Sequence, residues 1–363
     1  MALSDIMRKA ESSLNSITLK RSQRRGWQPL IVGYTGYGTT DQVRIFGRVL
    51  MHDPDEGKKD TWGQRGYQQF LTIQVGHHDV SVTIGEKTVT GTTDRNGYID
   101  LLVHDHELEP GWHTATIEAA NAKAVEVQLL IVDPAAKIGI ISDIDDTVLV
   151  TWLPRALTAA WNSWAKRPSK RQAVPGMAEF YAQLQRRFPQ APVFYLSTGA
   201  WNTFGSLKKF LSHHGFPAGP MLLTDWGPTE TGLFRSGQEH KRVQLRNLLI
   251  AYPDMQWILI GDDGQHDPLT YGDVANEHPD RIHSVLIRNL SPQEQLLSHG
   301  SLSPLADANE EGHFTIPLIQ GANGSALAAA FNSAHPTEYA ALNDETRLGL
   351  PIRPRRVLIT AFS

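Results

Sequence analysis

Hydrophobic and polar residues alternate along much of the first third of the chain. The stretches "DVSVTIG" (79–85) and "AVEVQLLIVD" (124–133) place apolar residues at every second position, and Asn96-Gly97 interrupts a third apolar stretch. A period of two is typical of strands that bury one face, and Asn-Gly favours a tight turn between strands. Residues 28–135 are therefore predicted to form a small antiparallel β-sandwich.

From about residue 134 onward, short apolar segments alternate with segments of helical periodicity. Strands are expected at "KIGIIS" (137–142), "PVFYLS" (192–197), "PMLLTD" (220–225), "QWILIG" (256–261) and "IHSVLI" (282–287), and helices at about 154–165, 176–187, 201–214, 239–251 and 268–278. This alternation is typical of βαβ units and a parallel sheet. Residues 136–300 are thus predicted to form a Rossmann-like α/β domain.

The two ends of the chain differ in pattern from these two domains. Apolar residues recur at helical spacing near the start, with basic residues close by, so residues 1–27 are predicted to form an amphipathic helix and basic arm. This helix either packs on its own domain or anchors weakly to an anionic membrane. Residues 301–363 form a C-terminal extension that either folds back onto a domain or is partly disordered.

Composition and charge narrow the possible functions. A net charge of −4 over 363 residues gives no support for a nucleic-acid-binding protein, which normally shows a basic excess. The absence of cysteine excludes disulfides, thiol nucleophiles and cysteine-ligated zinc. No signal-peptide pattern and no apolar run of about 18 residues occurs, so we expect a cytoplasmic protein without a transmembrane segment.

Acidic and hydroxyl side chains follow three of the predicted parallel strands. They are Asp143, Asp145, Asp146 and Thr147 after the first strand, Ser197 and Thr198 after the second, and Asp262, Asp263 and Asp267 after the fourth. Because ligands of open α/β sheets bind beyond the carboxyl ends of the strands, these residues are expected to converge. Clustered carboxylates need a counter-charge, and Mg²⁺ is the cation that best suits a few carboxylates together with phosphate oxygens.

Four segments, in order, resemble the motifs of the haloacid-dehalogenase superfamily of aspartate-nucleophile phosphatases. They are "SDIDDTV" (142–148), "VFYLSTG" (193–199), Lys241 and "ILIGDDGQHD" (258–267). More narrowly, "YLSTGAWN", "HKRVQLRNLLIAYP" and "LIGDDGQHDPLTY", behind a β-rich region containing "GYGTTDQVRIFGRVL", resemble the actin-patch phosphatidate phosphatase family. The resemblance implies an α/β phosphatase domain of the haloacid-dehalogenase type, preceded by the sandwich.

The resemblance also implies a role for each motif residue. Asp143 would be the nucleophile and Asp145 the general acid and base, with Ser197 donating a hydrogen bond to the phosphoryl group and Lys241 neutralising its charge. The implied metal ligands are Asp143, the backbone carbonyl of Asp145, Asp262 and Asp267, and the implied substrate-binding residues are Thr147, Thr198 and Asn202. Asp146 is expected to shape the loop, and Asp263 either binds metal or hydrogen-bonds its own loop.

These expectations define a function and its alternatives. We predict a Mg²⁺-dependent phosphatase that hydrolyses a phosphate monoester through an aspartyl-phosphate, with phosphatidate as the expected substrate. The alternatives are a phosphatase of a soluble metabolite or phosphoprotein, and a non-catalytic module that binds a membrane or protein. Within residues 152–171, the basic residues are more typical of a solvated face and the tryptophans of a core. Both would also suit contact with an anionic lipid surface.

Overall fold

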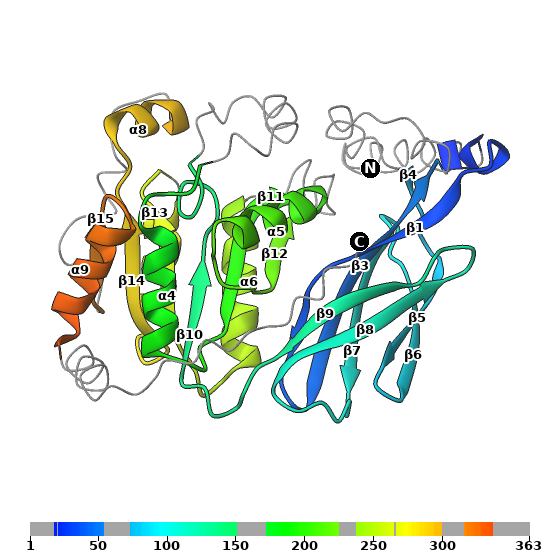
Figure 1. Ribbon diagram of the computed structural model, residues 1–363, viewed down its shortest axis with the longest axis horizontal. Helices are drawn as coiled ribbons and strands as arrows, with labels where there is room; N and C mark the ends of the chain where they lie inside the picture. The colour runs from blue at the N-terminus through cyan, green and yellow to red at the C-terminus, as the bar shows by residue number, and fades with distance from the viewer. Residues whose placement is uncertain are drawn as a thin grey trace, which may run out of the picture.

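The computed structural model describes residues 18–19, 21–53, 73–150, 172–224, 237–264, 266–299 and 316–336. Two regions follow one another along the chain: an antiparallel sheet, drawn in blue to cyan, and a parallel sheet with helices, drawn in green to orange (Figure 1). This is the predicted fold class. The expected helix at 154–165 and most of the expected N-terminal arm lie outside the described residues.

The N-terminal region is one hydrogen-bonded sheet. Its strands are β1 (Gln28–Gly33), β2 (Gly36–Gly38), β3 (Gln42–His52), β4 (Ile73–Gln74), β5 (Asp79–Ile84), β6 (Lys87–Thr92), β7 (Tyr98–His104), β8 (Gly111–Ala119) and β9 (Val125–Ile131). The long strand β3 pairs with β1, β2, β4 and β7, so the two halves of the predicted sandwich are joined. All pairs are antiparallel except β2 with β9. The alternating apolar residues of β1, β3, β5, β7, β8 and β9 share a single core.

The second region is a parallel sheet in the order β12-β11-β10-β13-β14-β15. Its strands are β10 (Ile138–Ser142), β11 (Val193–Ala200), β12 (Met221–Thr224), β13 (Gln256–Asp262), β14 (Ile282–Arg288) and β15 (Leu318–Gly321). The helices are α4 (Met177–Arg187), the 3-10 helix η3 (Trp201–Thr203), α5 (Phe204–His213), α6 (Gly237–Ala251), α7 (Asp267–Glu277), α8 (Pro292–His299) and α9 (Gly324–Ala334). The order reverses on either side of β10, where doubly wound sheets bind ligands.

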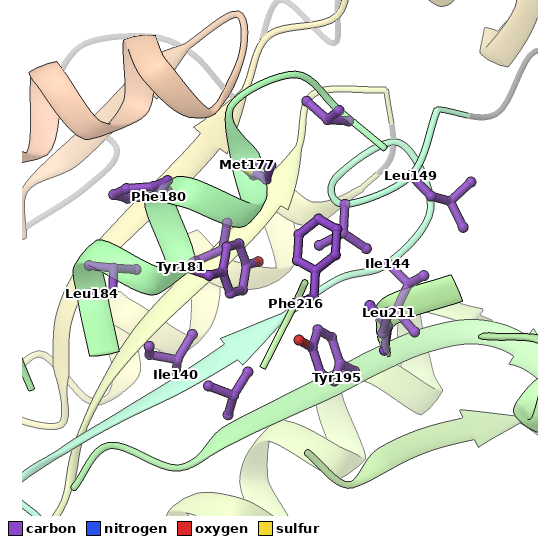
Figure 2. Close-up of a cluster of buried hydrophobic side chains, with 14 of the residues drawn as sticks. Ile140, Ile144, Leu149, Met177, Phe180, Tyr181, Leu184, Tyr195, Leu211 and Phe216 are labelled. Atoms are coloured by element: carbon purple, nitrogen blue, oxygen red, sulfur yellow. The ribbon is translucent and has the colours of Figure 1, made fainter. Parts of the chain in front are cut away.

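Successive residues of the buried strands face opposite sides of the parallel sheet. On β10, Ile140 packs with α4, α5 and α9, whereas Ile141 packs with α6 and α7. Helix α4 contributes Met177, Phe180, Tyr181 and Leu184, whose i, i+3, i+4, i+7 spacing forms one apolar stripe. In Figure 2, Tyr181 and Leu184 of this stripe lie on the side of Ile140 of the sheet, and Phe180 meets Phe331 of α9 edge-on. The strands are buried on both faces, which explains why they read as unbroken apolar runs.

Part of the predicted C-terminal extension belongs to this sheet. Strand β15 pairs in parallel with β14, and α9 packs against α4. Asn323 caps α9 by accepting a hydrogen bond from the backbone N–H of Ala326 at 3.0 Å. The α/β unit therefore extends beyond the expected boundary at residue 300, because residues 318–334 complete its edge.

Aromatic side chains join the two regions. The ring of Tyr34, which follows β1, stacks on Trp201 with centroids 4.4 Å apart, and Tyr37 meets Phe194 edge-on. Trp201 directly follows the second motif strand β11, so the N-terminal sheet supports a segment that adjoins the expected site. Within the described ranges, none of the helices combines the length and apolar character needed to cross a bilayer.

Candidate active site

The loop after β10 interleaves carboxylates with apolar anchors. Ile144, Val148 and Leu149 are completely buried in the core cluster that contains Tyr181 and Phe216 (Figure 2). These anchors hold the loop against the protein, so the intervening carboxylates are fixed at the end of the strand. The N–H of Asp143 donates to the carbonyl of Ile260 on β13 at 2.8 Å, which ties the start of the loop to the neighbouring strand.

Lys241 links two carboxylates that lie far apart in sequence. Its Nζ donates to Oδ1 of Asp143 at 2.6 Å and to Oδ1 of Asp267 at 2.5 Å. All three side chains are at most 3% exposed. Helix α6 carries the lysine and the first turn of α7 carries Asp267, so the sheet order brings these groups to one point. Such a buried pair is costly to break because one charge would lose its partner.

The charges of the site are unbalanced. Burial by itself lowers the pKa of Lys241, but the surrounding carboxylates outweigh this effect and the net pKa is raised, so the ammonium stays charged. Burial raises the pKa of Asp143 to about 8, an effect that Lys241 opposes and that the charges of Asp267 and Asp145 increase. One ammonium does not neutralise this many carboxylates, so the site favours a further cation.

Three buried carboxylates are placed to hold that cation. One oxygen each from Asp143, Asp262 and Asp267 lies within 4.8 Å of the others. Oδ2 of Asp143 and Oδ2 of Asp267 are buried and accept no hydrogen bond from the described residues. An all-oxygen set of this kind suits a hard divalent cation. A buried carboxylate oxygen that accepts no hydrogen bond needs another partner, and such a cation would provide it. The donor set therefore fits the predicted metal.

Ser197 lies beside the expected general acid. Its Oγ donates to Oδ2 of Asp145 at 3.0 Å and accepts from the N–H of Gly199 at 2.9 Å. Thr147 is completely buried and its Oγ1 donates to Oδ2 of Asp262 at 3.4 Å. The structure thus places Ser197 against Asp145, and Thr147 against a candidate metal ligand.

A cavity of about 210 Å³ opens onto this cluster, and its lining adds residues that the sequence motifs did not identify. The lining consists of Thr198, Gly237, Gln238, Lys241, His266, Asp267 and Thr270. His266 is exposed at the start of α7, one residue before Asp267, and its position inside "GDDGQHD" is the signal that could have singled it out. Asn202 does not line this cavity, but its Oδ1 is buried and accepts no hydrogen bond within the described part of the chain.

The two remaining acids of the motifs serve their loops. Asp263 accepts hydrogen bonds from the N–H of Leu290 at 2.8 Å and from Nδ2 of Asn289 at 3.2 Å. Asp146 has a left-handed backbone with φ of 59°, and its N–H donates to the carbonyl of Leu149 at 2.8 Å.

Lys208 lies over the ring of Phe204 and reaches Gln128 of β9, which places it at the junction of the two regions.

A known protein family matches the region of the chain that contains these groups. Residues 138–289 match the family described as phosphatidate phosphatase APP1, catalytic domain. The resemblance drawn from the sequence motifs is thereby confirmed for this part of the chain. The APP1 match begins at β10 and ends just after β14, so it contains every residue of the Asp143, Lys241, Asp262 and Asp267 cluster.

Individual relatives share the same segment. The chain is 28% identical over 152 residues to phosphatidate phosphatase APP1 of Saccharomyces cerevisiae, covering 42% of this chain and 26% of that protein. It is 26% identical over 154 residues to an uncharacterized protein of Schizosaccharomyces pombe, covering 42% and 25% respectively. The chain thus spans about a quarter of the length of the curated relatives it matches.

Two solved structures have a low overall similarity in shape to this chain. One is the HAD domain of effector protein Lem4 from Legionella pneumophila, at 14% identity and a TM-score of 0.28, covering 42% of this chain and 87% of that one. Another is a carbohydrate acetylesterase from Xanthomonas citri, at 9% identity and a TM-score of 0.27, covering 73% and 70%.

A glycine beside Asp267 provides a test of the metal site. A Cβ on Gly261 would lie 2.6 Å from Oδ2 of Asp267 and 2.7 Å from the ring of Tyr271, so Gly261→Ala must displace Asp267. We expect the apparent affinity for Mg²⁺, measured as metal-dependent phosphate release, to fall by roughly 10- to 100-fold. Gly205→Ala is the matched control, because its Cβ would meet nothing within 4 Å and its helix position favours alanine. An unchanged Mg²⁺ dependence in Gly261→Ala would remove Asp267 from the metal site.

Proposed function

We propose that this chain is a Mg²⁺-dependent phosphatase that hydrolyses a phosphate monoester through an aspartyl-phosphate, with phosphatidate as substrate and diacylglycerol and phosphate as products. The supporting observation is the buried cluster in which Lys241 bridges Asp143 and Asp267 while Asp262 completes a three-carboxylate set. A purely structural role would not favour so much negative charge in a buried place that opens into a cavity.

In the first step the carboxylate of Asp143 attacks phosphorus. An oxygen–phosphorus bond forms to Asp143 while the bond from phosphorus to the leaving oxygen breaks, and Asp145 gives its proton to that oxygen. The ammonium of Lys241, 2.6 Å from Asp143, orients the nucleophile and offsets the negative charge of the phosphoryl oxygens. Ser197, whose hydroxyl donates to Asp145 in this structure, would donate to a phosphoryl oxygen of the bound substrate instead.

In the second step water hydrolyses the aspartyl-phosphate. Asp145, now ionised, takes a proton from the water as its oxygen attacks phosphorus, and the bond to Asp143 breaks. The products are inorganic phosphate, the free carboxylate of Asp143 and protonated Asp145, so the cycle closes. As the proposed proton carrier, Asp145 is only 7% exposed and is held in place by the hydrogen bond that Ser197 donates to it.

Asp143, Asp262, Asp267 and the backbone carbonyl of Asp145 would hold Mg²⁺. When bound, the ion supplies positive charge to the phosphoryl oxygens and keeps the carboxylates ionised. Thr198 lines the cavity, Asn202 lies in η3 and Thr147 lies on the loop after β10; these residues would contact the substrate or position the metal ligands.

The choice of phosphatidate rests on the yeast relative. That protein is named a phosphatidate phosphatase and shares 28% identity over the segment that contains the site. A cytoplasmic chain that binds anionic lipid at a membrane surface would meet such a substrate without a transmembrane segment. The alternative substrate is a soluble phosphate monoester, and the same buried cluster would act on it by the same chemistry.

The test is a phosphate-release assay on the full chain with Mg²⁺. We expect release from p-nitrophenyl phosphate and from phosphatidate in mixed micelles, and loss of both when the metal is chelated. Cleavage of soluble esters without cleavage of phosphatidate would support the phosphatase activity and exclude phosphatidate as the substrate. Binding to phosphatidate vesicles without any phosphate release, for every ester tried, would instead indicate a non-catalytic binding module.

A further inference from the structure

The two acids without a catalytic role, Asp146 and Asp263, both contact residues 288–294. This segment runs from the last residue of β14 to the first turn of α8. Arg288 pairs in register with Asp262 on the neighbouring strand β13. The 288–294 segment therefore lies beside the loop that carries Asp145 and the loop that follows Asp262.

Arg288 is buried and makes three hydrogen bonds in different directions. Its Nη1 donates to the backbone carbonyl of Asp146 at 2.7 Å, its Nη2 to Oε1 of Glu294 at 2.6 Å, and its Nε to the carbonyl of Ala322 at 3.3 Å. The side chain of Arg288 is 5% exposed and that of Glu294 is 9% exposed. A planar guanidinium with five donors suits this arrangement, whereas a lysine does not.

The carbonyl that Arg288 binds belongs to a strained peptide. Asp146 has a φ of 59°, in the left-handed region that residues other than glycine adopt rarely, although aspartate and asparagine tolerate it better than most. The N–H of Asp146 donates to Leu149 and its carbonyl accepts from Arg288, so the residue is held on both sides. Because Asp145 directly precedes it, the direction of the Asp145 side chain depends on this conformation.

Glu294 is in turn held by the start of α8. It accepts a hydrogen bond from the N–H of Ser291 at 2.9 Å, while its own N–H donates to Oγ of Ser291 at 3.3 Å, which forms a capping box. Burial alone raises the pKa of Glu294, but the hydrogen bonds from Arg288 and Ser291 outweigh it and the net pKa is lowered. Glu294 is therefore an ionised partner for the guanidinium.

The same segment binds the second acidic loop. The N–H of Asp263 donates to the carbonyl of Arg288 at 3.0 Å, and the carboxylate of Asp263 accepts from Leu290 and Asn289. Asp262 immediately precedes Asp263. Residues 288–294 thus connect the loop of the expected nucleophile and proton carrier with the loop of an expected metal ligand.

We propose that Arg288, held by Glu294, is a positioning residue: its hydrogen bond to the carbonyl of Asp146 sets the placement of Asp143 and Asp145 relative to Asp262. The proposal rests on the proposed phosphatase function and adds a residue that touches neither substrate nor metal. Precise placement matters because a shift of about 1 Å in a reacting group costs on the order of 100-fold in rate.

The first test measures kinetics of the full chain with p-nitrophenyl phosphate. Arg288→Gln should lower kcat by roughly 10- to 100-fold and leave KM within about twofold, since binding groups are untouched. Arg288→Ala should regain kcat when free guanidinium is added at millimolar concentration, whereas urea should not restore it. Glu294→Gln keeps the capping box and should show a smaller loss. Arg246→Gln, which breaks a half-exposed pair with Glu277, is the matched control and should behave as wild type.

The second test does not depend on activity. Amide hydrogen exchange of the full chain, read by mass spectrometry, should become faster in residues 144–150 of Arg288→Gln and stay unchanged in β5 and β8. Arg288→Lys provides a second variant if the glutamine variant does not fold.

The outcomes separate the two proposals. Unchanged exchange in residues 144–150 would overturn the positioning role, and so would faster exchange with an unchanged kcat in an active enzyme. Failure of guanidinium to restore kcat, together with a lowered unfolding temperature, would reduce Arg288 to a general stabilising role. If the wild-type protein releases no phosphate but residues 144–150 exchange faster in Arg288→Gln, the proposed phosphatase function is overturned. The structural role of Arg288 in holding the loop would still stand.

Discussion

Asp143→Asn is expected to abolish phosphate release, by roughly 10³-fold or more, at every Mg²⁺ concentration. An amide cannot form the acyl-phosphate, and it also removes one of the three carboxylates that lie within 4.8 Å of one another. The measurement is Mg²⁺-dependent phosphate release together with a search for the acid-stable phosphoenzyme, which wild type should form and the variant should not.

The same substitution should not destabilise the fold. Burial raises the pKa of Asp143, and the charges of Asp267 and Asp145 add to this effect, so removing the charge of Asp143 relieves an unfavourable burial while Asp267 stays paired with Lys241. Without Mg²⁺ the unfolding temperature is expected to equal or exceed that of wild type. Asp146→Asn is the matched control, because asparagine tolerates the left-handed backbone at φ of 59° and should lose far less activity. Turnover in Asp143→Asn close to that of wild type would show that Asp143 is not the nucleophile.

Lys241→Met is expected to remove activity and stability together. The substitution keeps the length and apolar stem of the side chain but deletes the ammonium that bonds Asp143 and Asp267. Leaving buried charge unpaired costs roughly 3–5 kcal/mol, and losing one charge-stabilising donor costs on the order of 10²- to 10³-fold in kcat. Denaturant unfolding with chelator and phosphate release with Mg²⁺ measure the two effects.

Asp143→Asn and Lys241→Met are expected to have opposite effects on stability, so combining them tests the ion pair. The double variant Lys241→Met with Asp143→Asn should be more stable than Lys241→Met alone, because fewer carboxylates remain uncompensated. Lys208→Met is the control, since Lys208 lies at the domain junction and its loss should leave kcat unchanged. A Lys241→Met protein with wild-type stability in chelator would contradict the described ion pairs.

Much of the fold follows from local periodicity. The five predicted parallel strands and four of the predicted helices appear within a few residues of their expected positions, because strands buried on both faces and amphipathic helices leave strong patterns. Strand β15 is different. Its four residues follow a stretch without clear periodicity, and only its pairing with β14 identifies it as a strand. The parallel pairing of β2 with β9 was likewise unpredictable, since it joins residues about 90 positions apart.

The candidate site was predictable in its chemistry but not in its contacts. The order of Asp143, Ser197, Lys241 and Asp262 along the chain indicates which groups meet at the sheet edge. The sequence did not show that Lys241 would bridge two carboxylates, and it left open whether Asp263 binds metal or hydrogen-bonds its loop. His266 and Gln238 were missed because nothing in a periodic pattern marks the wall of a cavity.

The sequence by itself determined the candidate reacting groups, the antiparallel and parallel regions and the strand ends from which the acids project. These features depend on residue type and on periods of two and 3.6 residues, which are local properties. Tertiary structure alone decided which oxygens share Lys241, how Tyr34 meets Trp201 and that Arg288 holds the carbonyl of Asp146. Those contacts join residues between 26 and 167 positions apart, and their geometry depends on the order of the strands and the packing of the helices, which no local pattern specifies.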